Sequence, residues 1–194
     1  MKKGTRVLIE IICIALLVAL DQWTKRLAVI HLMDQPAFEL IPGILQLYFL
    51  PGGNTGAAWG MLSGHQLLFV FVSVAIVAVI LYMLIRLPAD KKYTVLRILL
   101  VFIAAGGIGN MIDRVARQSV IDFIYIKAIN FPIFNVADMY VSCAIVVLVL
   151  LFIFKYDDDD IKEMESYLKQ RKKSDRAVPA QERTHGANET DESA

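Results

Sequence analysis

Long apolar runs separated by short polar segments dominate the chain of 194 residues. Four of these runs approach the roughly 20 residues that an α-helix needs to cross the hydrocarbon core of a bilayer. They cover about Val7–Ala28, Gln66–Arg86, Tyr93–Ile112 and Val136–Phe154. Each run ends in polar or helix-breaking residues. The pattern therefore predicts an all-α integral membrane protein with four transmembrane helices.

The distribution of Lys and Arg predicts which ends of the spans face the cytoplasm. Positive charges precede the first span and bracket the short second connection, at Lys2, Lys3, Arg6, Arg86, Lys91, Lys92 and Arg97. The connection over 29–65 has no Lys or Arg, and the segment between the third and fourth spans carries Arg117 and Lys127. Because positively charged connections stay in the cytoplasm, we expect both termini inside and both long connections outside.

The first span also has features of a cleavable signal peptide. Met1–Ala19 begins with positive charges, continues as an apolar run and has small residues near its end. However, Glu10 interrupts this run, and the apolar helix continues past Asp21 to Ile30. We therefore expect the first span to remain in the protein.

Two segments outside the spans differ in composition. The region over 38–62 mixes β-forming residues with Pro and Gly, which predicts a small extracytoplasmic antiparallel sheet between the first and second helices. After Tyr156, a run of four Asp is followed by Lys and Arg, and no large apolar residue follows Val178. We expect a membrane domain over 1–156 and a charged cytoplasmic tail over 157–194, largely disordered beyond a short helix.

Charge balance and the scattered His and Cys argue against several classes of function. A net charge of +1 leaves no basic excess for binding nucleic acid. Cys13 and Cys143 fall at different depths of the predicted spans, so no disulfide is expected. The His residues are isolated, and no group has metal-ligand spacing. We expect no metal and no other cofactor.

Ionisable side chains inside a span cost roughly 2.5–3.5 kcal/mol each on insertion scales, so each needs a partner or a function. Asp21 and Lys25 are four residues apart on the first span and are expected to form a structural ion pair. The third span carries a polar stripe of Asn110, Asp113, Arg114 and Arg117, preceded by Gly106, Gly107 and Gly109. The glycines allow close approach of another helix or of a substrate. The guanidinium of Arg114 can donate two parallel hydrogen bonds to phosphate or carboxylate oxygens. The sequence is equally consistent with a binding role and a structural role for this residue.

Two further carboxylates, Asp122 and Asp138, stand among apolar residues near the predicted outer surface, without an adjacent Lys or Arg. Two such groups brought together cannot both ionise cheaply and share one proton. The pair can then activate a water and polarise a peptide carbonyl, without a metal or a covalent intermediate. Alternatively, Asp138 only caps the N-terminus of the last span.

Five blocks of sequence resemble, in order and spacing, the signature of the lipoprotein signal peptidases, an aspartic intramembrane peptidase family. They are Asp21–Lys25, Asn54–Trp59, Gly106–Arg114, Val120–Phe123 and Phe134–Asp138. The resemblance extends over nearly all of the chain to Tyr156. Two residues depart from the family pattern, because Gln118 stands where a glycine is usual and Trp59 replaces a phenylalanine.

This resemblance implies a function and a site. Asp122 and Asp138 would be the catalytic pair. Residues that bind substrate or support the site are implied at Asp21, Lys25, Asn54, Gly56, Ala57, Asn110, Arg114, Asn135 and Ala137. The family removes the signal peptide from prolipoproteins, cutting just before a cysteine that carries diacylglycerol. The implied partners are these prolipoproteins and membrane phospholipid, with a monomeric enzyme whose site faces the extracytoplasmic side of the bacterial plasma membrane.

Other classes of function explain the intramembrane polar residues less well. An ion-coupled transporter or channel subunit is the main alternative, since Asp, Asn and Arg inside spans also mark ion pathways. Yet the predicted spans show no repeats, and both aspartates lie near one face of the membrane rather than at its midplane. A non-catalytic scaffold would leave the cost of burying Asp122 and Asp138 unexplained.

Overall fold

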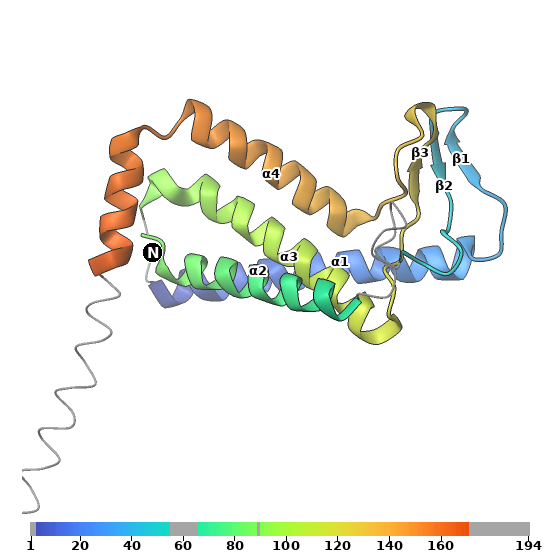
Figure 1. Ribbon diagram of the computed structural model, residues 1–194, viewed down its shortest axis with the longest axis horizontal. Coiled ribbons are helices and arrows are strands. Elements are labelled where there is room, and N and C mark those ends of the chain that lie inside the picture. The colour runs from blue at the N-terminus through green and yellow to red at the C-terminus, as the bar shows by residue number, and fades with distance from the viewer. Residues whose placement is uncertain (1–2, 55–65, 89, 171–194) are drawn as a thin grey trace, which may run out of the picture.

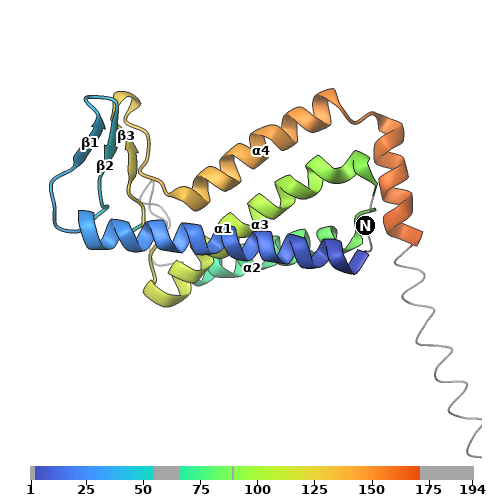
Figure 2. The ribbon, with the colours of Figure 1, turned by 180° about the vertical axis from the view of Figure 1, so that it is seen from behind.

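The computed structural model describes residues 3–54, 66–88 and 90–170, and the protein is mostly helical (Figure 1). The helices are α1 (Lys3–Leu32), α2 (Gln66–Arg86), α3 (Thr94–Arg117) and α4 (Val136–Phe154), with short 3-10 turns η1 (Lys91–Tyr93) and η2 (Lys127–Ile129). The strands are β1 (Phe38–Ile41), β2 (Leu45–Leu47) and β3 (Ile124–Ile126). The helices extend along the long axis, and the sheet lies at the end opposite the N-terminus (Figures 1 and 2).

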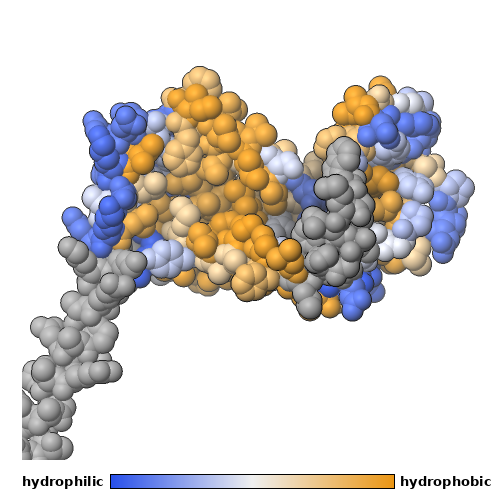
Figure 3. All heavy atoms as spheres, in the orientation of Figure 1, coloured by the Kyte–Doolittle hydropathy of each residue, from blue (hydrophilic) through white to orange (hydrophobic). Residues whose placement is uncertain are grey.

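The helical body has the apolar character of a membrane protein. Within the described residues, three helical segments are long and apolar enough to cross a bilayer, Gly4–Leu32, Lys91–Arg117 and Val136–Phe154, with mean hydropathies of 2.0, 2.0 and 2.6. The apolar stretch Val70–Arg86 within α2 is shorter. Hydrophobic atoms cover the middle of the molecule and hydrophilic atoms gather at its two ends (Figure 3). A bilayer accommodates this division, because its apolar core is bounded by two polar surfaces.

Helix α3 is central, because it packs against α1, α2 and α4. A Cβ atom on Gly106 would lie 2.5 Å from the carbonyl oxygen of Ala137, and one on Gly109 would lie 2.5 Å from Oδ2 of Asp21. Both distances are too short for a side chain, so these glycines allow α4 and α1 to approach α3 closely. The early part of α1 also packs in this core, where Ile14 is buried. A first span that stays in the protein, rather than being cleaved as a signal peptide, is expected to pack against the other helices in this way.

The sheet is antiparallel in the order β1-β2-β3. Pro42 and Gly43 form the turn between β1 and β2, where Gly43 has φ +72° and the amide of Ile44 donates to the carbonyl of Ile41 over 3.0 Å. Proline followed by a residue of positive φ is typical of a type II turn. The two strands fall within the predicted region over 38–62, of which residues 55–62 lie outside the described part.

The third strand was not predicted, because it comes from the connection between α3 and α4. In the register, Leu45 pairs with Ile126 and Leu47 pairs with Ile124. Isolated bridges extend this arrangement, between Asn54 and Val120 and between Ile124 and Phe134. The two long connections are therefore joined into one structure.

A second hydrophobic cluster attaches the sheet to the ends of the helices. Its buried members are Ala28 of α1 together with Ile121 and Phe123, and Leu47 of β2 and Val136 of α4 pack against them. Asp122 lies between the two buried residues of its own segment. The cluster thereby holds the segment containing Asp122 beside the first turn of α4.

A short helix over 158–170 follows α4 and lies across the end of the molecule where the N-terminus is found (Figures 1 and 2). Tyr156 stacks on Tyr93, with ring centroids 6.0 Å apart. Lys92 pairs with Asp160 and, over 2.9 Å, with Glu163. The start of the charged tail is thus helical, while residues 171–194 lie outside the described part.

Candidate active site

The backbone around Asp122 is held by residues before α2. Helix α3 ends at Arg117, and its C-cap residue, Gln118, has a φ of +60°, which explains why a glycine suits this position. The following segment runs antiparallel to residues 48–54, and the amide of Leu50 donates to the carbonyl of Asp122 over 3.2 Å. Gly53 also has a positive φ, and a Cβ atom there would lie 2.6 Å from Oγ of Ser119. This close pairing brings Nδ2 of Asn54 within 2.8 Å of Oδ2 of Asp122.

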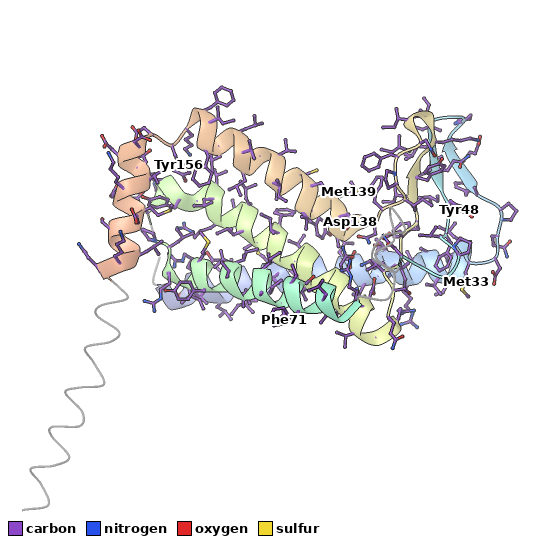
Figure 4. All side chains as sticks on the ribbon, viewed as in Figure 1. Met33, Tyr48, Phe71, Asp138, Met139 and Tyr156 are labelled. Carbon is purple, nitrogen blue, oxygen red and sulfur yellow. The ribbon has the colours of Figure 1, made fainter. Side chains whose placement is uncertain are left out.

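Asp138 lies in the first turn of α4, at the end of the helix that faces the sheet (Figure 4). Asn135, not Asp138, is the N-cap, and the two form a capping box in which Oδ2 of Asp138 accepts from the amide of Asn135 over 3.1 Å. The other oxygen, Oδ1, accepts from Nδ2 of Asn110 on α3 over 2.7 Å. Helix capping therefore accounts for one oxygen of Asp138 and leaves the other directed at α3.

Asn135 links the two aspartates. Its Nδ2 donates to Oδ1 of Asp122 over 2.7 Å and to Oδ1 of Asn110 over 3.1 Å, while its own Oδ1 accepts from the amide of Asp138 over 3.0 Å. The side chain is fully buried, so these bonds are not exchanged with water. A single asparagine thus holds a carboxylate from each side of the site.

The electrostatic environment of the pair combines burial with directed donors. Asp122 is 1% exposed, and burial raises the pKa of its carboxyl to about 6. Asn54 and Asn135 oppose this rise by donating hydrogen bonds to the charged form, whereas the negative charge of Asp138 adds to it. A carboxyl with this pKa exchanges a proton near neutral pH, as an acid or base in hydrolysis must.

Lys25 forms a buried ionic cluster with two carboxylates, not one. Its Nζ lies 2.9 Å from Oδ2 of Asp21, 2.9 Å from Oδ2 of Asp113 and 2.8 Å from Oδ1 of Asn110. The ion pair between Asp21 and Lys25 is present as expected, but Asp113 was assigned only to a polar stripe. The sequence held one signal for its role, because a second intramembrane carboxylate needs a cation and Lys25 was available.

Asp21 and Asp113 each bind the backbone just before one aspartate of the pair. Oδ1 of Asp21 accepts from the amide of Ala137 over 3.0 Å, and Oδ2 of Asp113 accepts from the amide of Ile121 over 3.3 Å. Ala137 precedes Asp138 and Ile121 precedes Asp122. Lys25 is therefore connected, through two carboxylates, to the backbone that carries both members of the pair.

The remaining predicted site residues are placed less centrally or lie outside the described part. Arg114 on α3 donates to the carbonyl of Asn110 over 3.4 Å, one turn earlier on the same helix. Gln22 was missed by the sequence reading, although its Nε2 donates to Asp21 over 3.1 Å and to the carbonyl of Gly109 over 3.0 Å. Gly56, Ala57 and Trp59 lie outside the described residues.

Comparison with known proteins relates this chain to one family. The sequence model of the family described as Signal peptidase (SPase) II matches residues 13–154. A protein named lipoprotein signal peptidase from Enterococcus faecalis is 42% identical over 156 residues, covering 80% of this chain and 92% of the relative. Proteins of the same name from Listeria monocytogenes and Geobacillus thermodenitrificans are 41% and 40% identical, covering 72% and 79% of this chain and 89% and 92% of the relatives.

Two solved structures are also similar, and each is described as a bacterial membrane enzyme determined by the in meso method. The first has a TM-score of 0.63 at 30% sequence identity, and the match covers 74% of this chain and 87% of the other. The second has a TM-score of 0.66 at 30% identity, with coverage of 76% and 94%. The similarity thus extends to the three-dimensional arrangement of most of the chain.

Proposed function

Because the chain belongs to the lipoprotein signal peptidase family, also described as signal peptidase II, we propose that it removes signal peptides from prolipoproteins by aspartic hydrolysis. The proposed substrates carry diacylglycerol on a cysteine, and the proposed cut falls just before that cysteine. The observation that supports the chemistry best is Asn135, which binds Asp122 and contacts Asp138 in one buried network. The relatives are peptidases, so they lend no support to the alternative of an ion-coupled transporter.

In the proposed mechanism, Asp122 and Asp138 share one proton. The ionised carboxylate takes a proton from water as the water oxygen attacks the peptide carbonyl carbon, and the protonated carboxyl gives its proton to the carbonyl oxygen. As the tetrahedral diol collapses and the C–N bond breaks, the protonated carboxyl gives its proton to the departing amine and the ionised carboxylate takes a proton from a diol hydroxyl, which restores the shared proton. The products are the signal peptide with a new carboxylate and the lipoprotein with a free amino group on its lipidated cysteine.

The supporting residues have proposed roles that follow from their contacts. Asn54 and Asn110 each donate to one aspartate, Asp21 holds the amide of Ala137, and Arg114 offers a positive charge beside Asp138. Gly56 and Ala57 are proposed to contact the substrate, on the basis of the sequence resemblance. We propose that the enzyme acts as a monomer through residues 1–156, and that the tail over 157–194 is dispensable for cleavage.

We propose four membrane spans, with both termini in the cytoplasm and the aspartates at the extracytoplasmic face. The start of α1 and the helix over 158–170 lie at the same end of the molecule, as an even number of crossings requires (Figure 1). In a cysteine-free background, Gly52→Cys and Asn130→Cys should react with an impermeant thiol reagent in intact spheroplasts, and Asp90→Cys should not. Labelling confined to Asp90→Cys would show the opposite orientation.

The proposed substrate is tested with purified protein and two precursors that differ only in the diacylglyceryl group. Acyl chains anchor a substrate in the bilayer by about 0.8 kcal/mol per buried CH₂, so the unlipidated precursor should be cleaved at least about 100-fold more slowly. Mass spectrometry of both fragments identifies the bond that is cut. Equal cleavage of the two precursors, or a cut elsewhere, contradicts the proposed specificity.

The pH dependence of cleavage should report the carboxyl of Asp122. Since burial raises its pKa to about 6 while Asp138 is already ionised, kcat/KM should fall as the pH rises through about 6, where the pair loses its shared proton. Asn54→Ala removes a donor that stabilises the charged form, so this alkaline limb should move to higher pH, by up to about one unit. The measurement is kcat/KM for a lipidated precursor between pH 4 and pH 8.

Asn130→Ala is the matched control for this pH profile. Asn130 is exposed and accepts from the hydroxyl of Tyr125 over 2.7 Å, away from both aspartates. Its removal should leave the alkaline limb in place. A limb that stays unchanged in Asn54→Ala, or moves equally in both variants, would assign the titration to another group.

A further inference from the structure

A groove of about 440 Å³ lies between α1 and α3, at the opposite end of the helices from the aspartates. Its apolar walls come from Ile9, Leu16, Leu17, Ile98, Val101 and Phe102. Arg6 at one end of the groove precedes Asp21 by 15 residues on the same helix, or roughly 22 Å along its axis. Ile9, Leu16 and Ile98 are exposed on the side of the helices, so the groove opens toward the apolar part of the bilayer.

Two buried arginines line the polar end of this groove. Arg6 and Arg97 are 4% and 8% exposed. Nη2 of Arg6 donates to the carbonyl of Leu87 over 3.2 Å, and Nη1 of Arg97 donates to the carbonyl of Pro88. Both side chains therefore also brace the segment between α2 and α3.

The charges in the groove are not balanced. Glu10 is the carboxylate beside the two arginines, and its Oε1 lies 3.7 Å from Nε of Arg6 and 3.5 Å from Nε of Arg97. Within the described part of the chain, Nε and Nη1 of Arg6 and Oε2 of Glu10 are buried without a hydrogen-bond partner. A buried guanidinium with unsatisfied hydrogen-bond donors is energetically costly. An anion that enters the groove would meet an opposite charge and accept hydrogen bonds from these donors.

The helix ends reinforce this positive potential. Arg6 and Arg97 each lie in the first turns of their helices, α1 and α3, which both begin at this end of the molecule (Figures 1 and 2). The N-terminal end of a helix carries a partial positive charge, which favours an anion. The same end of the groove thus combines two guanidinium groups with two helix dipoles.

We propose that this groove binds an anionic glycerophospholipid, with its phosphate against Arg6 and Arg97 and one acyl chain along the apolar walls. Guanidinium forks match phosphate oxygens, which accounts for the polar end. A free phosphate ion would leave the apolar walls uncovered, and a neutral hydrocarbon chain would leave the arginine donors unmet. The lipid site lies in the leaflet opposite the aspartates and is separate from substrate cleavage.

The two native cysteines provide a direct test. Cys13 lines this groove, whereas Cys143 lines a separate apolar groove between α3 and α4, and both are free. The full chain is purified in detergent, delipidated and treated with a membrane-permeant maleimide, and the modification of each cysteine is followed by peptide mass spectrometry. Phosphatidylglycerol should slow modification of Cys13 at least about threefold and leave Cys143 unchanged, because only the first groove has the guanidinium donors.

Phosphatidylcholine and inorganic phosphate serve as the matched probes, and both should leave Cys13 as reactive as in the lipid-free protein. Equal protection by phosphatidylcholine would show that the groove binds an acyl chain regardless of the net charge of the headgroup. Protection by inorganic phosphate would show an anion site that needs no lipid. Either result, or no protection by phosphatidylglycerol, overturns the proposal.

Substitution of the arginines tests the polar end. Arg6→Gln and Arg97→Gln should each weaken phosphatidylglycerol binding about tenfold or more in native mass spectrometry, because each removes charge-assisted hydrogen bonds. Lys91→Gln removes the same charge from an exposed position at the same end of the molecule and should bind as the wild type does. Equal weakening in Lys91→Gln would mean a non-specific basic surface. If an arginine variant does not fold, protection of Cys13 in the wild-type chain still decides the proposal.

Discussion

Asp122→Asn and Asp138→Asn should each lower single-turnover cleavage of a lipidated prolipoprotein by about 10⁴-fold or more, while the protein still inserts and folds. An amide resembles the carboxyl in shape but neither accepts nor delivers the proton that hydrolysis transfers. The double variant should be no slower than either single variant, because the first substitution already removes the shared-proton mechanism. Cleavage is normalised to the amount of folded protein.

Asp158→Asn is the control for this prediction, since Asp158 is exposed on the helix over 158–170 at the far end of the molecule. It should cleave at the wild-type rate within a few-fold. Wild-type turnover by either variant of the pair would exclude the two-aspartate mechanism. Loss of wild-type activity on addition of a chelator would also exclude it, because the mechanism uses no metal.

Lys25→Met should destabilise the protein by about 3–5 kcal/mol, because it leaves two buried carboxylates without their cation. Asp21 and Asp113 are 0% and 1% exposed, so water cannot replace the ammonium group. Cleavage by the protein that remains folded should also fall, since the two carboxylates hold the backbone before Asp138 and before Asp122. Thermal unfolding in detergent measures the stability, and single-turnover kinetics measure the cleavage.

Two comparisons isolate the cause of this loss. Lys127→Met removes a lysine from an exposed pair, 3.3 Å from Glu39, and should cost far less stability than Lys25→Met because water screens this pair. Adding Asp21→Asn and Asp113→Asn to Lys25→Met should restore much of the stability, because it removes the unpaired charges and leaves oxygens that accept the same backbone amides. If Lys25→Met is no less stable than Lys127→Met, the buried cluster does not hold the site together.

Hydropathy was sufficient to predict a mostly helical membrane protein, because the length and apolar character of a span are local properties of the sequence. The predicted bounds of the last span, Val136–Phe154, match α4, and the predicted resemblance to the lipoprotein signal peptidases is confirmed by the family comparison. The pair of Asp21 and Lys25 was also predictable, since residues four apart share a helical face. The catalytic roles of Asp122 and Asp138 remain predictions.

Contacts between distant segments were decided by the tertiary structure. β3 pairs with β2 across about 80 residues of sequence, and such pairing depends on a register that neither strand carries alone. Asp113 shares Lys25 with Asp21 because α1 and α3 pack side by side, and Asn135 reaches Asp122 because the sheet and α4 converge on one segment. Sequence spacing specifies which residues share a face of one helix, but the free energy of burying a charge is set by partners from other helices.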